Sequence, residues 1–290
     1  MGYELNKTVS LSWLARELGV EFHGKDISIR EVSSLDRCES GALTFATVLS
    51  SQLNGVAVIT TFENYHIDDF VNGYLITDSP RKLFVLAMNI LNKEIGFSLY
   101  KLEPVIHSSV RLGDNVIIEK GCIVGENTII EANVVLHSGT KIGKNCRIRA
   151  NSCIGGDGFG FERLASGELL RFPHLGGVEI QDNVEIGSLN SIARGTLSDT
   201  VIGLGVKTDN LVHIAHNCII GKNSIITACA ELSGGVILGE SVWVGPNASI
   251  IQKVSIGSNS LIGIGAVVTK NVPDNCVFAG HPAKKIRDNN

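Results

Sequence analysis

The residues best suited to chemistry lie in one short segment, 209–217, which reads Asp-Asn-Leu-Val-His-Ile-Ala-His-Asn. His216 could act as a general base, and Asp209, seven residues earlier, could hold its tautomer. Gly234 stands 18 residues after His216 and could offer a backbone N–H to an oxyanion. Together these groups suit acyl transfer to an amine or a hydroxyl. The spacing also fits a polar surface without chemistry, on which His213 and His216 would be ordinary neighbours.

The 18-residue interval has meaning because aliphatic residues recur at every sixth position through most of residues 110–268. Short strands of this period stack into a prism with three faces, and each coil uses three repeats. The pattern predicts a left-handed parallel β-helix of roughly seven to eight coils, about 35 Å tall at the usual strand spacing. Residues one coil apart should then stack, which places Gly234 over His216. The repeating residues are Leu112, Ile118, Val124, Ile130, Leu136, Ile142, Ile148, Ile154, Ile180, Ile186, Ile192, Ile202, Ile214, Ile220, Ile226, Leu232, Leu238, Val244, Ile250, Ile256, Ile262 and Val268, with Thr208 the one exception in the last series.

A second position of the repeat, four residues after each aliphatic residue, carries small or β-branched side chains, among them Cys122, Cys146 and Cys218. We interpret these cysteines as interior fillers and not as metal ligands or disulfide partners. Glycine often follows the aliphatic residue, where a corner would favour its permissive φ angle. His137 has no partner that the spacing places, so we interpret it as solvated or structural.

Two insertions interrupt the repeat, a long one at residues 155–177 and a short one between Ile192 and Ile202. Insertions in a regular solenoid emerge as loops, often on the functional side. The long insertion is either a β-hairpin or a wall of a binding cleft, and the sequence favours neither. Its glycines surround Asp157, Phe159 and Phe161.

Residues 1–103 lack the repeat and predict a small α/β domain. A short helix should run from Trp13 to Leu18 and end at Gly19. Strands are expected at 41–46 and 56–60, and an amphipathic helix at 81–92. The predicted division is therefore an amino-terminal domain at 1–103, a β-helix at 104–268 and a carboxy-terminal tail at 269–290.

The composition limits the class of protein. The net charge of −4 argues against a nucleic-acid partner, which would require neutralisation of phosphates. No apolar run is long enough for a membrane span, and the first residues do not resemble a signal peptide. The seven cysteines contain no C-x-x-C pair, so we expect a reduced, cytoplasmic protein with no metal site.

Three motifs resemble the UDP-3-O-acylglucosamine N-acyltransferases of lipid A biosynthesis: 156–161 (Gly-Asp-Gly-Phe-Gly-Phe), Asp209-Asn210, and 214–217 (Ile-Ala-His-Asn). The likeness covers roughly residues 1–250 and implies a homotrimer of β-helices with active sites between subunits. It implies that His216 is the base, that Asp209 orients it and that the Gly234 amide meets the oxyanion. It also implies that the amino-terminal domain binds a uridine, on which Phe45 stacks. The expected acceptor-binding residues are Phe45, Asp157, Phe159, Phe161, Asn210 and His213.

This sequence departs from the family pattern at several places. Lys253 stands where the family has a second active-site histidine, and Ala193 stands where it has an acidic residue before Arg-Gly. The chain stops at Asn290 without the helical extension that engages acyl carrier protein in the family. Segments 265–273 and 279–286 resemble instead the ends of coenzyme A-dependent sugar acetyltransferases. Basic residues that could meet coenzyme A phosphates are Lys253, Lys270, Lys284 and Lys285, although a solvated basic tail would look the same.

The sequence therefore favours an acyltransferase that moves an acetyl or other short acyl group from acyl-coenzyme A to the amine of a UDP- or dTDP-linked amino sugar. One alternative is a lipid A N-acyltransferase that uses a hydroxyacyl carrier protein. An alternative of another class is a β-helix scaffold without turnover, which would have no need of His216, Asp209 and Gly234 together.

Overall fold

The computed structural model describes residues 3–48, 53–65 and 71–289. The chain divides into two compact units. The amino-terminal unit comprises Met1–Lys101 and Gly160–Leu175, and the β-helix unit comprises Leu102–Phe159 and Gly176–Asn290.

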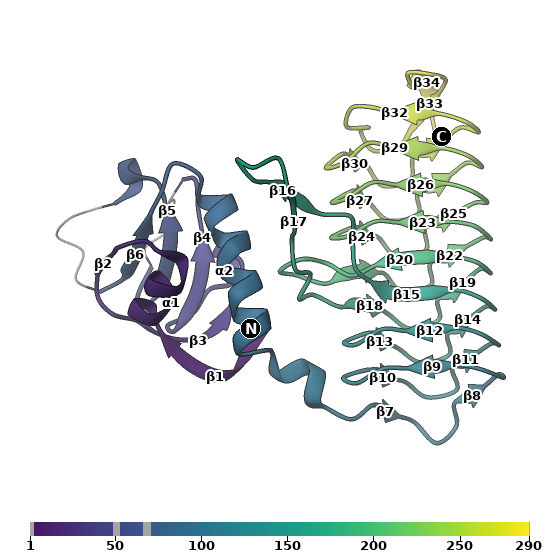
Figure 1. Cartoon of the computed structure of the whole chain (residues 1–290). Coiled ribbons are helices and arrows are strands. Elements are labelled where there is room, and N and C mark those ends of the chain that lie inside the picture. Colours follow the sequence, from purple (N-terminus) through teal and green to yellow (C-terminus); the bar gives the residue numbers. More distant parts are fainter. Residues whose placement is uncertain (1–2, 49–52, 66–70, 290) are drawn as a thin grey trace. The chain divides into compact units, whose positions relative to one another are not determined.

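The amino-terminal unit is a six-stranded mixed sheet with two α-helices (Figure 1). The strand order is β1-β3-β4-β5-β6-β2, in which β3, β4, β5 and β6 run parallel and β1 and β2 pair antiparallel at the edges. Its elements are β1 (Tyr3–Ser10), α1 (Leu11–Leu18), β2 (Phe22–Gly24), β3 (Ser28–Val32), η1 (Leu35–Arg37), β4 (Ala42–Phe45), β5 (Ala57–Thr60), η2 (Phe62–Asn64), β6 (Gly73–Ile76), α2 (Pro80–Glu94) and η3 (Ser98–Lys101).

Local signals explain where the helices begin and end. The Ser10 hydroxyl accepts the Trp13 N–H at 3.1 Å and caps α1, and Gly19 ends this helix at φ 68°. Pro80 opens α2, where its missing N–H costs nothing. Both helices bury one apolar face. The predicted helices and strands of this region are thus present, within two residues of their expected ends.

Part of the long insertion belongs to the amino-terminal unit, which differs from the expected domain boundaries. Strands β16 (Phe161–Arg163) and β17 (Leu169–Arg171) form an antiparallel hairpin that packs on α2. The Asn89 amide donates to the Arg171 carbonyl at 3.0 Å, and Arg81 lies over the Phe172 ring at 5.6 Å. The interpretation of the insertion as a β-hairpin is therefore correct for its second half, which contains β16 and β17.

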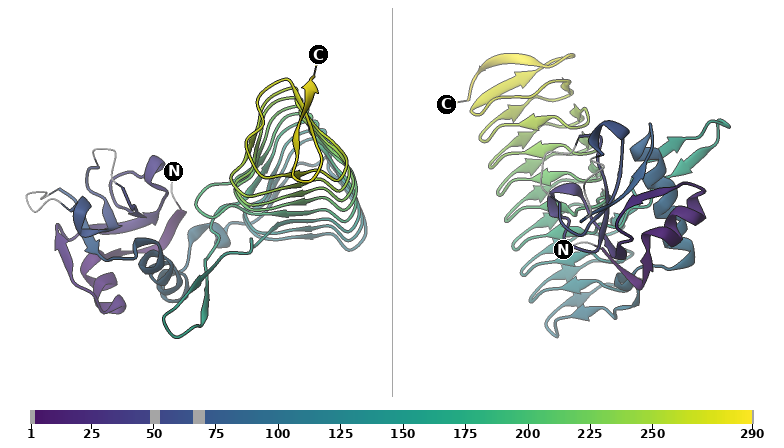
Figure 2. Two further views of the ribbon diagram at one scale, coloured as in Figure 1. Left: turned by 90° about the horizontal axis from the view of Figure 1, so that it is seen from above. Right: turned by 90° about the vertical axis from the view of Figure 1, so that its left-hand side faces the viewer.

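The second unit is the predicted left-handed parallel β-helix, whose three sheets surround one core (Figures 1 and 2). Face 1 holds β7 (Val105–Ile106), β10 (Ile123–Val124), β13 (Lys141–Ile142), β18 (Val178–Ile180), β21 (Thr200–Ile202), β24 (Ile219–Ile220), β27 (Ile237–Leu238) and β30 (Ser255–Ile256). Face 2 holds β8 (Arg111–Leu112), β11 (Ile129–Ile130), β14 (Arg147–Ile148), β19 (Glu185–Ile186), β22 (Lys207–Thr208), β25 (Ile225–Ile226), β28 (Trp243–Val244), β31 (Leu261–Ile262), β33 (Cys276–Ala279) and β34 (Lys284–Asp288). Face 3 holds β9 (Ile117–Ile118), β12 (Val135–Leu136), β15 (Cys153–Gly156), β20 (Ser191–Ala193), β23 (His213–Ile214), β26 (Glu231–Leu232), β29 (Ser249–Ile250) and β32 (Val267–Val268).

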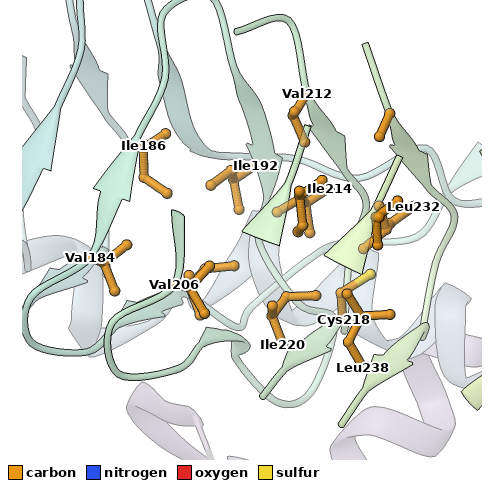
Figure 3. Close-up of a cluster of buried hydrophobic side chains, with 14 of the residues drawn as sticks. Val184, Ile186, Ile192, Val206, Val212, Ile214, Cys218, Ile220, Leu232 and Leu238 are labelled. Carbon is orange, nitrogen blue, oxygen red and sulfur yellow. The ribbon is translucent and has the colours of Figure 1, made fainter. Parts of the chain in front are cut away.

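The register confirms the 18-residue coil. Ile214 pairs with Leu232 and Leu232 with Ile250, each one coil apart. The side chains of Ile214 and Leu232 point into the prism with those of the other faces (Figure 3). These two residues and Ile250 leave almost no exposed surface. Thr208, which breaks the aliphatic pattern, is also buried, and its hydroxyl accepts the Gly187 N–H at 3.1 Å.

The predicted interior cysteines are buried fillers. Cys122, Cys146 and Cys218 are at most 2% exposed and belong to the β-helix core. Burial raises the pKa of the Cys218 thiol to about 11, which keeps this sulfur protonated and unreactive.

The corners correct our expectation about glycine. Asparagine is the commonest corner residue at positive φ, for example Asn145 at 54° and Asn223 at 57°, and glycines such as Gly121 at 73° take this conformation at other corners. The glycines that follow the aliphatic residues are needed for close approach instead. A Cβ on Gly125 would lie 2.7 Å from the Gly143 carbonyl of the next coil. Gly155 is an exception, since its φ is 85°.

The segment 269–289, which the sequence analysis treats as a tail, contains strands β33 and β34. Strand β33 pairs parallel with β31, and β34 folds back antiparallel on β33, so the hairpin covers the last coil of face 2. Capping of this kind protects the open edge of a solenoid. Among the described residues, neither helix is long and apolar enough to cross a membrane.

Candidate active site

His216 lies in the turn that follows β23, with its backbone fixed by buried Ile214. Its ring stacks under Gly234 of the next coil, as the 18-residue interval predicts. A Cβ added to Gly234 would lie 2.7 Å from both Nε2 and Cε1 of His216. Any side chain at position 234 would therefore displace the imidazole.

Asn217 determines which nitrogen of His216 carries the proton. The backbone N–H and the hydroxyl of Thr196 both lie within hydrogen-bond distance of Asn217 Oδ1, and Asn217 Nδ2 donates to the Ser198 hydroxyl at 2.9 Å. Oδ1 is therefore the acceptor, and His216 Nδ1, 2.9 Å away, must donate to it. The neutral ring then has Nε2 as its proton acceptor, on the side of Gly234.

The Gly234 N–H is placed to serve as a donor. Its neighbours are used in the coil, since the Ser233 N–H bonds to the Ile250 carbonyl and the Gly235 N–H bonds to the His216 carbonyl. Within the described part of the chain, the Gly234 N–H has no hydrogen-bond partner. A donor beside the base in this way suits a developing oxyanion.

These groups border a cavity of about 330 Å³ in the β-helix unit. The first half of the long insertion forms one wall of this cavity. For this half, the structure therefore agrees with the interpretation of the insertion as the wall of a cleft. The lining residues are Gly156, Asp157, Gly158, Phe159, Ser191, Ala193, His213, Ala215, His216, Glu231, Ser233, Gly234 and Gln252. Asp157, Phe159 and His213 are thus brought together with His216, as expected.

Arg194 holds this wall in place. Its side chain is buried and donates to the Gly155 carbonyl at 2.6 Å and to the Ser138 carbonyl at 2.7 Å. Asp157 lies 3.8 Å from the same guanidinium. The phenyl ring of Phe159 is 90% exposed, which leaves it open to contact with a ligand.

Asp209 and His216 lie at two successive corners of one coil, with β23 between them. Asp209 Oδ1 accepts the Asn210 N–H at 2.7 Å, and Asn210 Oδ1 accepts the Ser188 N–H at 2.8 Å. The orienting contact given by the structure comes from Asn217, and the predicted role of Asp209 stays a prediction.

Phe45 and Phe161 belong to the amino-terminal unit. Phe45 is half-buried and packs on Phe84 with 4.7 Å between ring centroids. Arg171 lies over the Phe161 ring at 4.7 Å.

The four candidate basic residues fall in two places. Lys253 stands one coil above Gly235 and next to Gln252 of the cavity wall, and its N–H donates to the Gly234 carbonyl. Lys270, Lys284 and Lys285 are exposed at the capped end, and Lys285 pairs with Asp288. Their predicted contact with a cofactor stays a prediction.

Comparison with known proteins identifies the family. The model of the bacterial transferase hexapeptide (six repeats) matches residues 103–138, 121–156, 199–234 and 235–270. A UDP-3-O-acylglucosamine N-acyltransferase of Campylobacter lari is 33% identical, over 97% of this chain and 95% of that protein. One of Helicobacter pylori is 40% identical, over 94% of this chain and 89% of that protein. The chain belongs to the UDP-3-O-acylglucosamine N-acyltransferase family.

Solved structures of other acyltransferases share the β-helix fold. LpxA from Acinetobacter baumannii superimposes with a TM-score of 0.59 and 30% identity, over 64% of this chain and 70% of that chain. A UDP-N-acetylglucosamine acyltransferase from Campylobacter jejuni superimposes with a TM-score of 0.53 and 26% identity, over 64% of this chain and 73% of that chain. As a member of this family, the chain is an acyltransferase of the hexapeptide-repeat class.

Several residues at the His216 cavity were not predicted from the sequence. Glu231 and Ser233 lie one coil above His213 and Ala215, so the 18-residue interval could have found them. The contact of Asn217 with His216 becomes evident only in the structure, where Thr196 and Ser198 of the short insertion orient the Asn217 amide. In the described residues, no group of three His, Cys, Asp or Glu side chains is placed to hold a metal ion.

Proposed function

We propose that this protein transfers an acyl group from a thioester to the amino group of UDP-3-O-acylglucosamine, with His216 as general base. The observation that carries the proposal is the set of His216, Asn217 and Gly234 at one cavity, in a chain of this family. This is the lipid A reaction, the alternative in the sequence analysis, and the relatives' names favour it over short-chain transfer to another amino sugar.

The chemistry follows from the geometry. The acceptor amine attacks the thioester carbonyl while Nε2 of His216 takes its proton. The carbonyl oxygen gains negative charge, which the Gly234 N–H stabilises. Collapse of this intermediate breaks the C–S bond, and the proton held by His216 passes to the leaving thiolate. Asn217 stabilises the imidazolium that exists between these two proton transfers.

Two features of the chain bear on the acyl donor. The family resemblance favours a hydroxyacyl carrier protein. The exposed basic residues Lys270, Lys284 and Lys285 favour the second candidate, acyl-coenzyme A, whose phosphates they could bind. We further propose a cytoplasmic homotrimer, in which neighbouring subunits complete each site.

The test is an assay of amide formation by mass spectrometry, with UDP-3-O-acylglucosamine as acceptor and either hydroxyacyl carrier protein or acetyl-coenzyme A as donor. Turnover with the carrier protein should exceed turnover with acetyl-coenzyme A. His216→Ala should lower the rate at least ~100-fold, whereas His107→Ala, an exposed histidine on the first coil, should not. Acceptor binding without turnover by either donor would favour a scaffold instead.

A further inference from the structure

A second cluster of reactive side chains lies on face 3, below the proposed base. Glu119 follows β9, His137 follows β12 and Cys153 begins β15. Nδ1 of His137 lies 3.1 Å from Glu119 Oε1, and Nε2 lies 3.3 Å from the Cys153 sulfur. Our sequence interpretation of His137 as a residue without a partner is therefore wrong.

The hydrogen bonds define the direction of proton transfer in this cluster. A carboxylate only accepts, so His137 Nδ1 donates to Glu119 and Nε2 of the neutral ring accepts from the Cys153 thiol. Glu119 is itself held, because Oε2 accepts the Ser138 N–H at 2.9 Å and the Ser138 hydroxyl at 3.0 Å. A thiol, a base and an orienting carboxylate in this order form a nucleophilic triad.

The electrostatics favour proton uptake by His137. The hydrogen bond to the Cys153 sulfur, with a smaller contribution from Glu119, raises the pKa of His137 above its ordinary value. Burial acts to raise the pKa of Glu119, but the donors on Ser138 and the His137 ring outweigh it and lower that pKa. Both shifts favour a protonated His137 ring beside an ionised Glu119, so the ring is well suited to take up the proton of the thiol.

The thiol also adjoins the cavity of the proposed acyltransferase. Cys153 pairs directly with Ser191, which lines that cavity. A Cβ on Gly156, another lining residue, would lie 3.7 Å from both the Cys153 sulfur and His137 Nε2. Cys153 is half-buried and the side chain of His137 is 30% exposed, so a thioester can approach the pair.

We propose that Cys153 is a second acyl-acceptor site, at which the His137–Glu119 pair activates the thiol toward an acyl thioester. The thiol proton moves to His137 Nε2, and the sulfur attacks the thioester carbonyl. The C–S bond of the donor breaks, and the donor leaves as a thiol with the proton from His137. The product is an acyl group in thioester linkage to Cys153. The inference rests on the proposed function only for the presence of a thioester at this cavity.

Cys229 provides a control within the same molecule. It is exposed, and its thiol has no hydrogen bond to any residue that the structure describes. Accessibility alone would make Cys229 the faster thiol. Activation by the triad predicts that Cys153 reacts at least ~10-fold faster at neutral pH, in keeping with assistance by a positioned base.

The experiment treats the whole protein with iodoacetamide, with acetyl-coenzyme A or with a medium-chain 3-hydroxyacyl-coenzyme A, and follows each cysteine peptide by mass spectrometry. We expect Cys153 to be alkylated first and to carry the acyl group, and His137→Gln and Glu119→Gln to remove its advantage over Cys229. Equal rates for the two cysteines in the wild-type protein would overturn the proposal, and this comparison needs no variant. Alkylation of Cys153 without acylation by either thioester would overturn it as well.

The variant His216→Ala separates this inference from the proposed function. Cys153 should still be acylated in that variant, while amide formation is lost. Amide formation by a wild-type protein whose Cys153 is never acylated would sink only the inference about Cys153. Acylation of Cys153 in a protein that never forms the amide would sink only the proposed function.

Discussion

The amide of Asn217 connects the proposed base to the short insertion of the β-helix. Its Oδ1 accepts from Thr196 as well as from His216, and its Nδ2 reaches Ser198. Gly195 is required beside this contact, because a Cβ there would overlap the Ser198 carbonyl oxygen and would also lie 3.0 Å from Asn217 Nδ2. The insertion therefore has a positioning role at the site, in addition to lengthening one coil.

Asn217→Ala should lower kcat/KM by ~10–100-fold, because His216 would lose the acceptor that fixes its tautomer. Asn217→Asp keeps an acceptor at the same place and should retain most of the activity. Its carboxylate favours the protonated imidazole, so the acid limb of the kcat/KM profile should move to higher pH. Profiles of the three proteins measure this, and an Asp variant as impaired as the Ala variant would contradict the tautomer argument.

The shifted pKa values of His137 and Glu119 predict a pH-dependent contribution to stability. The raised pKa of His137 gives stability that is present below about pH 6.5 and is lost as the pH rises through its folded value. The lowered pKa of Glu119 gives stability that is present above about pH 4.5 and is lost in acid. Between these values both contributions act.

The wild-type protein should therefore exceed His137→Gln in thermal stability by a wider margin at pH 6 than at pH 9. We expect at most about 1 kcal/mol, because the pair is partly exposed and screened by solvent. Thermal unfolding of both proteins at the two pH values measures this margin. A margin that does not change with pH would show that His137 acts only through packing.

Residue contacts within the repeat could be predicted from the sequence, and those outside it could not. The 18-residue interval correctly stacked Gly234 on His216, and it would also stack His137 on Glu119. The interval does not predict the contacts of Asn217, because the short insertion that orients its amide does not follow the repeat. The interval of seven residues correctly indicated that Asp209 and His216 would lie at different corners.

At the scale of elements, the corners depend on two residue types for different reasons. Asparagines and some glycines accept the left-handed conformation, whereas the glycines that follow the aliphatic residues allow adjacent coils to approach. The repeat located both residue types. We wrongly attributed the glycines after the aliphatic residues to a permissive φ angle, because spacing in sequence does not reveal the distance between coils. The amino-terminal elements were predictable because each has its own start or stop signal.

Gly203→Ala tests the close-approach argument. A Cβ at this position would lie 2.6 Å from the Ile220 carbonyl of the next coil, so the coils must move apart. We expect a loss of about 1–3 kcal/mol in the free energy of unfolding, as for other overpacked sites. Leu204→Ala, in the same corner and 41% exposed in the wild-type protein, should change it by no more than about 0.5 kcal/mol. Similar losses in the two variants, measured by thermal unfolding, would mean that the glycine is not needed for stacking.

At the scale of the whole molecule, a single chain leaves the predicted role of Asp209 unexplained. Six residues separate it from His216 along the coil, and the two lie on either side of β23. A side of the prism spans roughly 15–20 Å at the rise of extended chain, which is beyond the reach of one carboxylate. In a cyclic trimer, however, a corner of one subunit can face another corner of its neighbour. The expected trimer is thus the arrangement in which Asp209 could still serve His216.

Mixed trimers test this directly. Asp209→Asn and His216→Ala subunits are each expected to be nearly inactive alone, and they would be unfolded, mixed in equal amounts and refolded together. If each site joins His216 of one subunit to Asp209 of the next, random cyclic assembly leaves about one quarter of the sites with both groups, and activity should return to about that share of the wild-type value. Refolding each variant alone is the control for spontaneous recovery. If both groups act within one subunit, every mixed trimer lacks a complete site, and mixing should restore no activity.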